Sequence, residues 1–447
     1  MQKYNIGDKL KKITVTEFSY EGYGVYRDDN VTILIDGALE NEVVDIVLTK
    51  VNSKIIYADV VNIKKKSSSR LKDINKTIIE SGVAPLAIIN YSEQLLFKTN
   101  VVKTLAERQL NYFDTKDILA CEKEWNYRNK VTVFAELKNG MYKFGTYKRN
   151  SHKLIEMKQM PLAKNVLNKV LIWLVENFNK FDTKNSRIKN ITMKCNEKED
   201  CVQVVFSSYT KTNIDKTFID VFVSENPEIK SIIQTIENLD NKSDTYGALS
   251  KVILGETHIV DSIEDNKFIV EWNAFFQVNP YQTKHLYKTM VSNLNITKND
   301  IVLDAYSGIG TISTFLSKKA KSVYAVEIVE EAGKNGYQSA QMNGIDNIFF
   351  YTGNIDEELK NINDIGVVFD IVCVDPPRNG LTKEFIDLIS MHKPRGIGYI
   401  SCNPHTLIRD LKLFKDKGYK IKMIQPVDMF PQTHHIECVA ILEKINQ

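Results

Sequence analysis

The 447-residue chain is poor in cysteine, and its six cysteines are not spaced like the ligands of a metal site. They are Cys121, Cys195, Cys201, Cys373, Cys402 and Cys438, with no CxxC pair. A zinc knuckle and a disulfide framework are therefore not expected. No apolar run is long enough to span a bilayer, and the opening MQKYNIGDKLKK lacks the apolar core of a signal peptide. We expect a cytoplasmic protein without a membrane partner.

Charge of one sign is also not in large excess, because 59 Lys and Arg oppose 56 Asp and Glu for a net charge of +3. The net charge of the chain therefore does not indicate which class of partner it binds. Residues 62–72 (NIKKKSSSRLK) are basic and polar, which is typical of a linker. Residues 141–153 (MYKFGTYKRNSHK) interleave four cations with three aromatic rings, a pattern that favours single-stranded nucleic acid. A solvated hairpin would have the same pattern.

Three regions differ in their pattern of apolar residues. Residues 1–63 contain five short β-rich runs separated by turn signals, which predicts an OB-like β-barrel. Residues 64–270 contain both helix-like and strand-like patterns of apolar residues, with a helix expected over 91–110. They indicate a central α+β domain. Residues 271–447 alternate apolar strands with helical stretches, which predicts an α/β fold with a Rossmann-like, doubly wound sheet.

The predicted sheet carries polar residues where its strands end. Ligands of such sheets lie at the carboxyl ends of the strands. The first strand runs into LDAYSGIGTIS, the second ends at Glu327, and the fourth ends at Asp375 in VDPPRNG. Cys402 ends the fifth strand, although an isolated cysteine is more often an inert buried side chain. Ser313 replaces the third glycine of GxGxxG, which weakens the interpretation as a dinucleotide site and favours S-adenosyl-L-methionine (SAM).

Together these segments resemble a known family. LDAYSGIGTIS, DPPRNGL, SCNPHTLIRDL and DMFPQTHHIE follow one another in order, with FFQVNP upstream, as in the RNA uracil-5-methyltransferases. The resemblance covers nearly the whole chain, and residues 1–63 are similar to the TRAM domain that many members carry. It implies a SAM-dependent RNA methyltransferase whose central domain, residues 64–270, binds RNA and whose catalytic domain spans residues 271–447.

The resemblance also assigns roles to single residues. Cys402 matches the family's nucleophile and Glu437 its general base. The positions that match the SAM pocket are Gln277, Tyr306, Glu327, Asn354 and Asp375. Thr311 departs from the asparagine that many members have after Gly-x-Gly, so its contact with the cofactor is in doubt. No metal site is implied.

The chemistry that the resemblance implies needs a thiolate and a base on one uracil ring. The thiolate adds to C6 and makes C5 nucleophilic, and the base later removes the C5 proton. In this fold class the last strand is antiparallel to the fifth, so we expect Glu437 to lie beside Cys402. The histidines at 434 and 435 are expected to be structural or RNA-contacting residues.

Many relatives hold an iron–sulfur cluster on four cysteines, and this chain departs from them. The matching positions are Asn75, Ser81, Ala84 and Met160, none of which ligates such a cluster. We therefore expect no iron–sulfur cluster.

The expected substrate is a uridine of 23S ribosomal RNA, because TRAM-bearing bacterial members of the family mostly modify ribosomal RNA. A uridine in the T-loop of tRNA is the alternative. We expect a monomer. The sequence leaves less favoured possibilities, namely a cytosine-C5 RNA methyltransferase, a non-enzymatic ribosome-binding protein and an NAD oxidoreductase.

Overall fold

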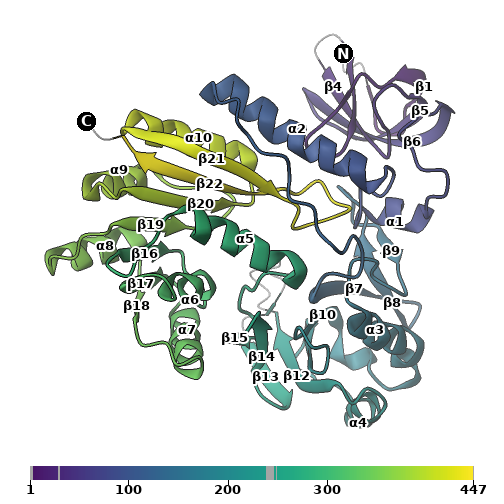
Figure 1. Cartoon of the computed structure of the whole chain (residues 1–447). Helices are drawn as coiled ribbons and strands as arrows, with labels where there is room; N and C mark the ends of the chain where they lie inside the picture. Colours follow the sequence, from purple (N-terminus) through teal and green to yellow (C-terminus); the bar gives the residue numbers. More distant parts are fainter. Residues whose placement is uncertain (1–3, 29–30, 238–245, 248, 446–447) are drawn as a thin grey trace.

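The computed structural model describes residues 4–28, 31–237, 246–247 and 249–445. Three large sheets follow one another along the chain, and the helices gather around the second and third (Figure 1). Within the described residues, no helix combines the length and apolarity that a membrane span requires.

The N-terminal β-domain is a six-stranded sheet around its own apolar core. Its strands are β1 (Lys9–Thr14), β2 (Glu17–Phe18), β3 (Gly24–Asp28), β4 (Val31–Asp36), β5 (Val43–Val51) and β6 (Ile55–Lys65). The five expected runs are present, and the first is divided into β1 and β2. The strand order β1-β5-β6-β4-β3-β2 is compatible with the expected barrel.

The central sheet has seven strands in the order β13-β12-β11-β10-β7-β8-β9. They are β7 (Lys130–Lys138), β8 (Met141–Tyr147), β9 (Leu154–Glu156), β10 (Ile188–Cys195), β11 (Val202–Ser208), β12 (Ile229–Ile236) and β13 (Leu249–Leu254). The helices α3 (Asn165–Asn177) and α4 (Lys216–Glu225) share one buried cluster with this sheet. Two short 3-10 helices, Phe178–Lys180 and Lys184–Ser186, follow α3.

The catalytic sheet has the order β18-β17-β16-β19-β20-β22-β21. Its strands are β16 (Ile301–Ala305), β17 (Ser322–Glu327), β18 (Ile348–Thr352), β19 (Ile371–Val374), β20 (Gly396–Ser401), β21 (Tyr419–Val427) and β22 (Glu437–Lys444). The strand β22 runs antiparallel to both of its neighbours, β20 and β21, whereas β16 to β20 pair in parallel. The surrounding helices are α5 (Pro280–Asn293), α6 (Thr311–Ser317), α7 (Glu330–Met342), α8 (Ile355–Asp364), α9 (Lys383–His392) and α10 (Pro404–Asp416). The expected doubly wound α/β fold is confirmed.

Two segments that the sequence places in the central domain pack on the catalytic sheet. The helix α2 (Tyr91–Leu110) has the expected bounds, begins at the Asn90 cap and lies along α10 (Figure 1). The hairpin β14 (His258–Ile263) and β15 (Asn266–Glu271) packs against α7. The short helix α1 (Lys76–Ser81) precedes α2. The domain limits at 63 and 270 stay a prediction.

The basic stretch 141–153 makes intramolecular contacts that the sequence does not reveal. Lys148 forms an ion pair with Asp59 of the N-terminal β-domain. Arg149 lies 3.3 Å from Asp36 and 3.9 Å from the centre of the Tyr23 ring. RNA binding by the stretch stays a prediction, and these two cations are paired within the protein. They hold the N-terminal β-domain against the central domain.

Candidate active site

A cleft of about 650 Å³ opens at the carboxyl edge of the catalytic sheet, where ligands of doubly wound sheets bind. Five of the seven residues that the family resemblance singles out line it: Gln277, Tyr306, Asp375, Cys402 and Glu437. They come from different strand ends and from the segment before α5. Within the described part of the chain, no group of His, Cys, Asp or Glu is arranged to hold a metal ion.

Cys402 and Glu437 meet because the last strand is antiparallel to its neighbour, as expected from the sequence. Ser401, the last residue of β20, pairs with Cys438 of β22. Cys402 follows Ser401, and Glu437 precedes Cys438. Because the two strands are antiparallel, Cys402 and Glu437 lie at the same edge of the sheet. Glu437 is only 5% exposed, and Cys402 is half-buried in the cleft wall. A thiol and a carboxyl group therefore face one enclosed space.

The SCNPHT segment connects Cys402 rigidly to the DPPRNG loop. Asn403 caps α10 by accepting a hydrogen bond from the amide of His405 at 3.1 Å, and its amide group donates to the carbonyl of Arg378 at 3.2 Å. The hydroxyl of Thr406 donates to the same carbonyl at 3.3 Å. Asp410 accepts from the amide of Leu381 at 2.8 Å. The motif therefore positions the loop that carries Asp375 and Arg378 relative to Cys402.

The charge state of the two reactive groups depends on their burial. Burial, together with the nearby Glu437, raises the pKa of the Cys402 thiol to about 11. Burial also raises the pKa of Glu437 well above its usual value, with Asp375 adding to the effect. Arg378 is the cation that lowers the pKa of both groups. Sequence reasoning missed this role, although the arginine stands in the quoted DPPRNG segment.

The glycine-rich turn after β16 is shaped for the close approach of a ligand. Tyr306, Gly308 and Gly310 have positive φ angles of 63°, 55° and 74°. A side chain at Gly308 would meet no atom within 4 Å, so the space above the turn is open. The hydroxyl of Ser307 is buried without a hydrogen-bond partner. An open turn next to an unsatisfied polar group fits a bound polar cofactor.

Glu327 and Asn354 lie next to this turn, outside the cleft lining. Both carboxylate oxygens of Glu327 accept backbone amides, from Gly308 and Val329, each at 2.9 Å. The backbone carbonyl of Glu327 accepts from Gly353, which places the exposed Asn354 beside it. Glu327 ends β17 and contacts the glycine-rich turn, and Asn354 follows β18 by two residues at the same edge of the sheet.

Thr311 and Ser313, the two departures from common patterns, both have partners in the fold. Thr311 lies in the cleft and its hydroxyl is 3.1 Å from that of Tyr287. Ser313 donates to Asp304 at 2.5 Å, and burial raises the pKa of Asp304 to about 7. The serine therefore pairs with one oxygen of a buried carboxyl group near the end of β16, while the other oxygen, Oδ1, is buried without a partner.

The loop before Glu437, residues 428–435, is held by a buried polar network from α2. Lys98 donates to Asp428 at 2.6 Å and to the carbonyl of Phe430 at 3.0 Å. Tyr91 donates to the other oxygen of Asp428 at 2.8 Å. Gln94 exchanges hydrogen bonds with Gln432 at 2.8 and 2.9 Å. These contacts fix the approach of the chain to β22.

Tyr20 brings the N-terminal β-domain to the same region, which sequence reasoning missed. Its ring meets those of His405 and His434 edge-on, with centroids 5.1 and 6.2 Å apart. Its side chain packs on the core of the catalytic sheet. The domains thus converge on the loops that carry Cys402 and Glu437.

Comparisons with known proteins support the family that the sequence motifs resemble. A family model described as tRNA (uracil-5-)-methyltransferase matches residues 90–445. An uncharacterized RNA methyltransferase of Streptococcus mutans is 32% identical over 446 residues, 97% of this chain and 98% of that protein. One of Oceanobacillus iheyensis is 34% identical over 448 residues, 97% and 96% of the two chains.

A solved structure has the same fold over almost the whole chain. It is the Pyrococcus abyssi tRNA (uracil-54, C5)-methyltransferase in complex with S-adenosyl-L-homocysteine, with 23% identity, a TM-score of 0.74, and coverage of 97% of this chain and 99% of that one. The enzyme class expected from the sequence, a SAM-dependent RNA uracil-5-methyltransferase, is confirmed at the level of the family, since this chain belongs to the tRNA (uracil-5-)-methyltransferase family.

Proposed function

We propose that the protein methylates C5 of a uridine in 23S ribosomal RNA through a covalent adduct between Cys402 and C6 of the base. The observation that carries the proposal is the juxtaposition of Cys402 and Glu437 on neighbouring antiparallel strands, in one cleft with Asp375 and the glycine-rich turn. A structural cysteine has no need of a buried carboxyl group beside it. A cysteine that must add to a ring and leave again needs a base within reach.

Each reactive group has one task in this reaction. The Cys402 thiolate forms a bond to C6, and the electron pair of the C5–C6 double bond moves toward the C4 oxygen. SAM, when bound, supplies the methyl group that C5 takes up. The Glu437 carboxylate then removes the proton from C5, the double bond re-forms, and the bond between sulfur and C6 breaks. The thiolate is regenerated, and the proton passes to Glu437.

Both groups must first reach their charged forms, and burial opposes this. Arg378 lies at the cleft and favours the thiolate and the carboxylate alike. We assign Arg378 the role of lowering the pKa of Cys402 and Glu437, so that a larger fraction of each group is ionised. A thiolate, not a thiol, is the nucleophile.

SAM is supported as the cofactor by the shape and donor set of the site. The open turn at Gly308 and the unpartnered Ser307 hydroxyl suit a polar ligand, and Glu327 lies where a ribose is held in this fold class. The resemblance assigns Gln277, Tyr306, Asn354 and Asp375 to the same cofactor. The Pyrococcus relative holds the demethylated product of SAM.

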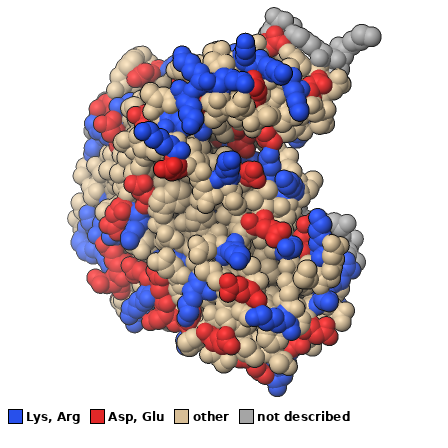
Figure 2. All heavy atoms as spheres, turned by 90° about the vertical axis from the view of Figure 1, so that its right-hand side faces the viewer, with Lys and Arg blue, Asp and Glu red and all other residues tan. Residues whose placement is uncertain are grey.

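The choice of RNA rests on the N-terminal β-domain, a second module that adds affinity without touching the target base. Figure 2 shows Lys and Arg side chains spread over the upper lobe, which carries this domain, above a hollow that separates it from the lower lobe. Lys and Arg side chains along one edge of a hollow can bind the phosphates of a large folded RNA.

A uridine of tRNA is the second candidate, and one observation favours it. The Pyrococcus protein, which matches 97% of this chain in fold, is named as a tRNA methyltransferase. An N-terminal β-domain is therefore compatible with either RNA.

One experiment separates the two candidates. Purified protein with SAM is offered protein-free 23S ribosomal RNA fragments and unmodified tRNA, and 5-methyluridine is mapped in both and in RNA from cells with and without the gene. We expect methylation of a ribosomal uridine and none of tRNA. Methylation of the T-loop uridine alone would overturn the substrate and leave the chemistry standing, whereas methylation of neither RNA would refute the function.

A further inference from the structure

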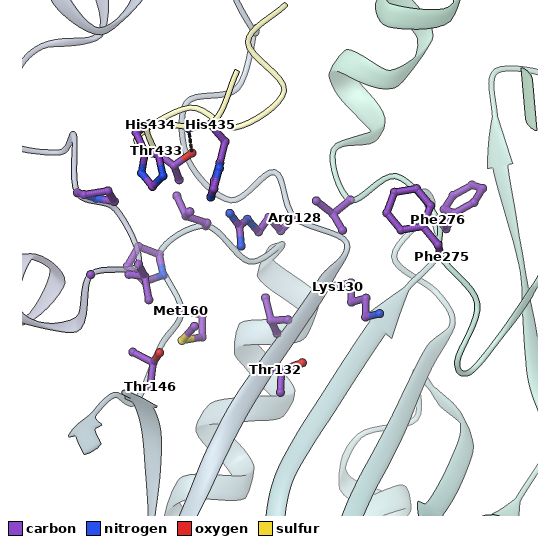
Figure 3. A pocket seen from close by; sticks show the side chains of 17 residues that line it. Arg128, Lys130, Thr132, Thr146, Met160, Phe275, Phe276, Thr433, His434 and His435 are labelled. Carbon is purple, nitrogen blue, oxygen red and sulfur yellow. Dashed lines mark hydrogen bonds between the residues drawn. The ribbon is translucent and has the colours of Figure 1, made fainter. Parts of the chain in front are cut away.

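A second cavity, of about 480 Å³, adjoins the catalytic cleft on the side of the central domain. Figure 3 shows the side chains that line it. Its walls come from residues 82–85, the start of β7, residues 160–162 and the loop at 433–435. Arg128, Phe275 and His435 line both this cavity and the catalytic cleft. A chain molecule bound in one can therefore continue into the other.

The lining of the second cavity is positively charged. It contains Arg128 and Lys130, and none of its described residues is an Asp or Glu. Among the described residues neither cation has a carboxylate partner, and the Nε of Arg128 is buried without a hydrogen bond. Their contacts are with the rings of Phe430 and Tyr246, at 5.8 and 5.5 Å from the ring centres. An anion is the ligand that two unpaired cations favour.

The same cavity offers flat rings and a free hydrogen-bonding edge. Phe275 is 73% exposed, and the rings of His434 and His435 lie 4.2 Å apart beside Arg128 (Figure 3). Burial lowers the pKa of these histidines to about 4 and about 3, so both are neutral near pH 7. Nδ1 of His434 is buried without a partner. Flat rings, one unsatisfied ring nitrogen and two cations match the parts of a nucleotide.

We propose that this second cavity receives the base of a nucleotide next to the target uridine in the same RNA strand, with Arg128 and Lys130 each contacting a phosphate of that strand. The inference rests on the proposed function. Taking one base out of a stack leaves its neighbours free to close the gap and expel it again. Holding an adjacent base in its own cavity keeps the strand open while Cys402 reacts.

The test is a double-mutant cycle between RNA and protein. The probe is a synthetic hairpin of about 20 nucleotides that carries the uridine identified by mapping, with an abasic residue on its 5′ or 3′ side. Its affinity for protein loaded with S-adenosyl-L-homocysteine is measured by fluorescence anisotropy. With the wild type, one of the two abasic positions should weaken binding about 10- to 100-fold. With His434→Ala the same abasic residue should cost little further affinity, because the lost contacts are shared.

A second variant tests the phosphate contact independently. Lys130→Gln should reduce the slope of log affinity against log salt by about 0.7, the value for one phosphate contact on a single strand. Lys138→Gln, at the exposed end of the same strand, should leave the slope unchanged. A melting-temperature shift by S-adenosyl-L-homocysteine shows that each variant is folded.

The outcomes separate this inference from the proposed function. If the wild type methylates the hairpin but both abasic positions act additively with His434→Ala, or neither weakens binding, the second cavity does not hold a neighbouring base. An unchanged salt slope for Lys130→Gln would remove the phosphate contact. If the wild type methylates no uridine, the proposed function fails first and the inference fails with it.

Discussion

The reactivity of Cys402 depends on the few charges within reach of its thiol. With a pKa of about 11, only about one thiol in ten thousand is ionised at pH 7. Glu437 opposes ionisation and Arg378 favours it. Without substrate, the thiol is therefore expected to react slowly with electrophiles near pH 7.

Arg378→Gln should make the thiol harder to ionise. Loss of the cation raises the pKa of Cys402 further, so the curve of iodoacetamide alkylation rate against pH should move to higher pH. Activity at pH 7 should fall by roughly 10-fold, as for a shift of one pKa unit. Arg395→Gln removes an arginine that pairs with Asp300 outside the cleft and is the matched control. A curve that stays in place for Arg378→Gln would show that its charge does not reach the thiol.

Glu437→Gln should trap the enzyme after methylation. An amide cannot take the C5 proton, so turnover should fall by about 10²- to 10⁴-fold while addition and methyl transfer continue. A covalent protein–RNA species should then accumulate on ordinary RNA and persist on a denaturing gel. Normal turnover, or loss of turnover without any adduct, would assign proton removal to another group.

Sequence patterns predict some of these residues better than others. Cys402 and Glu437 stand in the motifs SCNP and HHIE, and the strand order brings them together as expected. Arg378 and Tyr20 were missed because their roles depend on the spatial path of loops, which short-range patterns do not encode. The same limit applies to Lys148 and Arg149, whose partners lie about 90 to 110 positions away.

At the scale of elements, α2 supports the loop that leads into β22. Lys98 and Asp428 are both fully buried and bonded to each other. Removing one partner of such a pair leaves a buried charge uncompensated. The position of Glu437 therefore depends on a helix more than 300 positions earlier in the chain.

Lys98→Met should lower the free energy of unfolding by about 3–5 kcal/mol, because the buried Asp428 loses the cation and the hydrogen bond that compensate its burial. Urea denaturation followed by circular dichroism measures the change. Lys103→Met, on the same helix, removes an exposed pair with Asp117 and should cost less than about 1 kcal/mol. Equal effects of the two substitutions would contradict a structural role for the buried pair.

The elements themselves follow closely from the sequence, whereas their packing does not. The apolar runs after residue 300 give all seven strands of the catalytic sheet, and helical periodicity gives α2 with its observed bounds. Periodicity shows that α2 has an apolar face but not what covers it. That partner is α10 of the catalytic domain.

At the scale of the whole molecule, the three domains meet around the loops that carry Cys402 and Glu437. The N-terminal β-domain is attached to the central domain by Arg149 and Lys148 and reaches the catalytic loops through Tyr20. None of its described residues lines the catalytic cleft itself. Its contribution to the reaction is therefore expected in RNA binding and not in cofactor binding.

Deleting residues 1–63 should separate these two properties. Affinity for S-adenosyl-L-homocysteine, measured by calorimetry, should stay within a few-fold of the full chain. Affinity for the substrate RNA should fall by about 10- to 100-fold, because one of two linked binding modules is gone. Arg149→Gln weakens the attachment without deleting the domain and should give a smaller loss. Unchanged RNA affinity in the deleted protein would rule out a role of this domain in binding.

Covalent trapping tests the central claim most directly. RNA that carries 5-fluorouridine at the target position has no C5 proton to remove, so an enzyme that adds Cys402 to C6 and transfers the methyl group cannot release the product. With SAM, the wild type should give a denaturant-resistant protein–RNA adduct, and peptide mapping should place the bond on Cys402. Cys402→Ala should give no adduct. Equal trapping by Cys402→Ala, or a bond on another residue, would contradict the account.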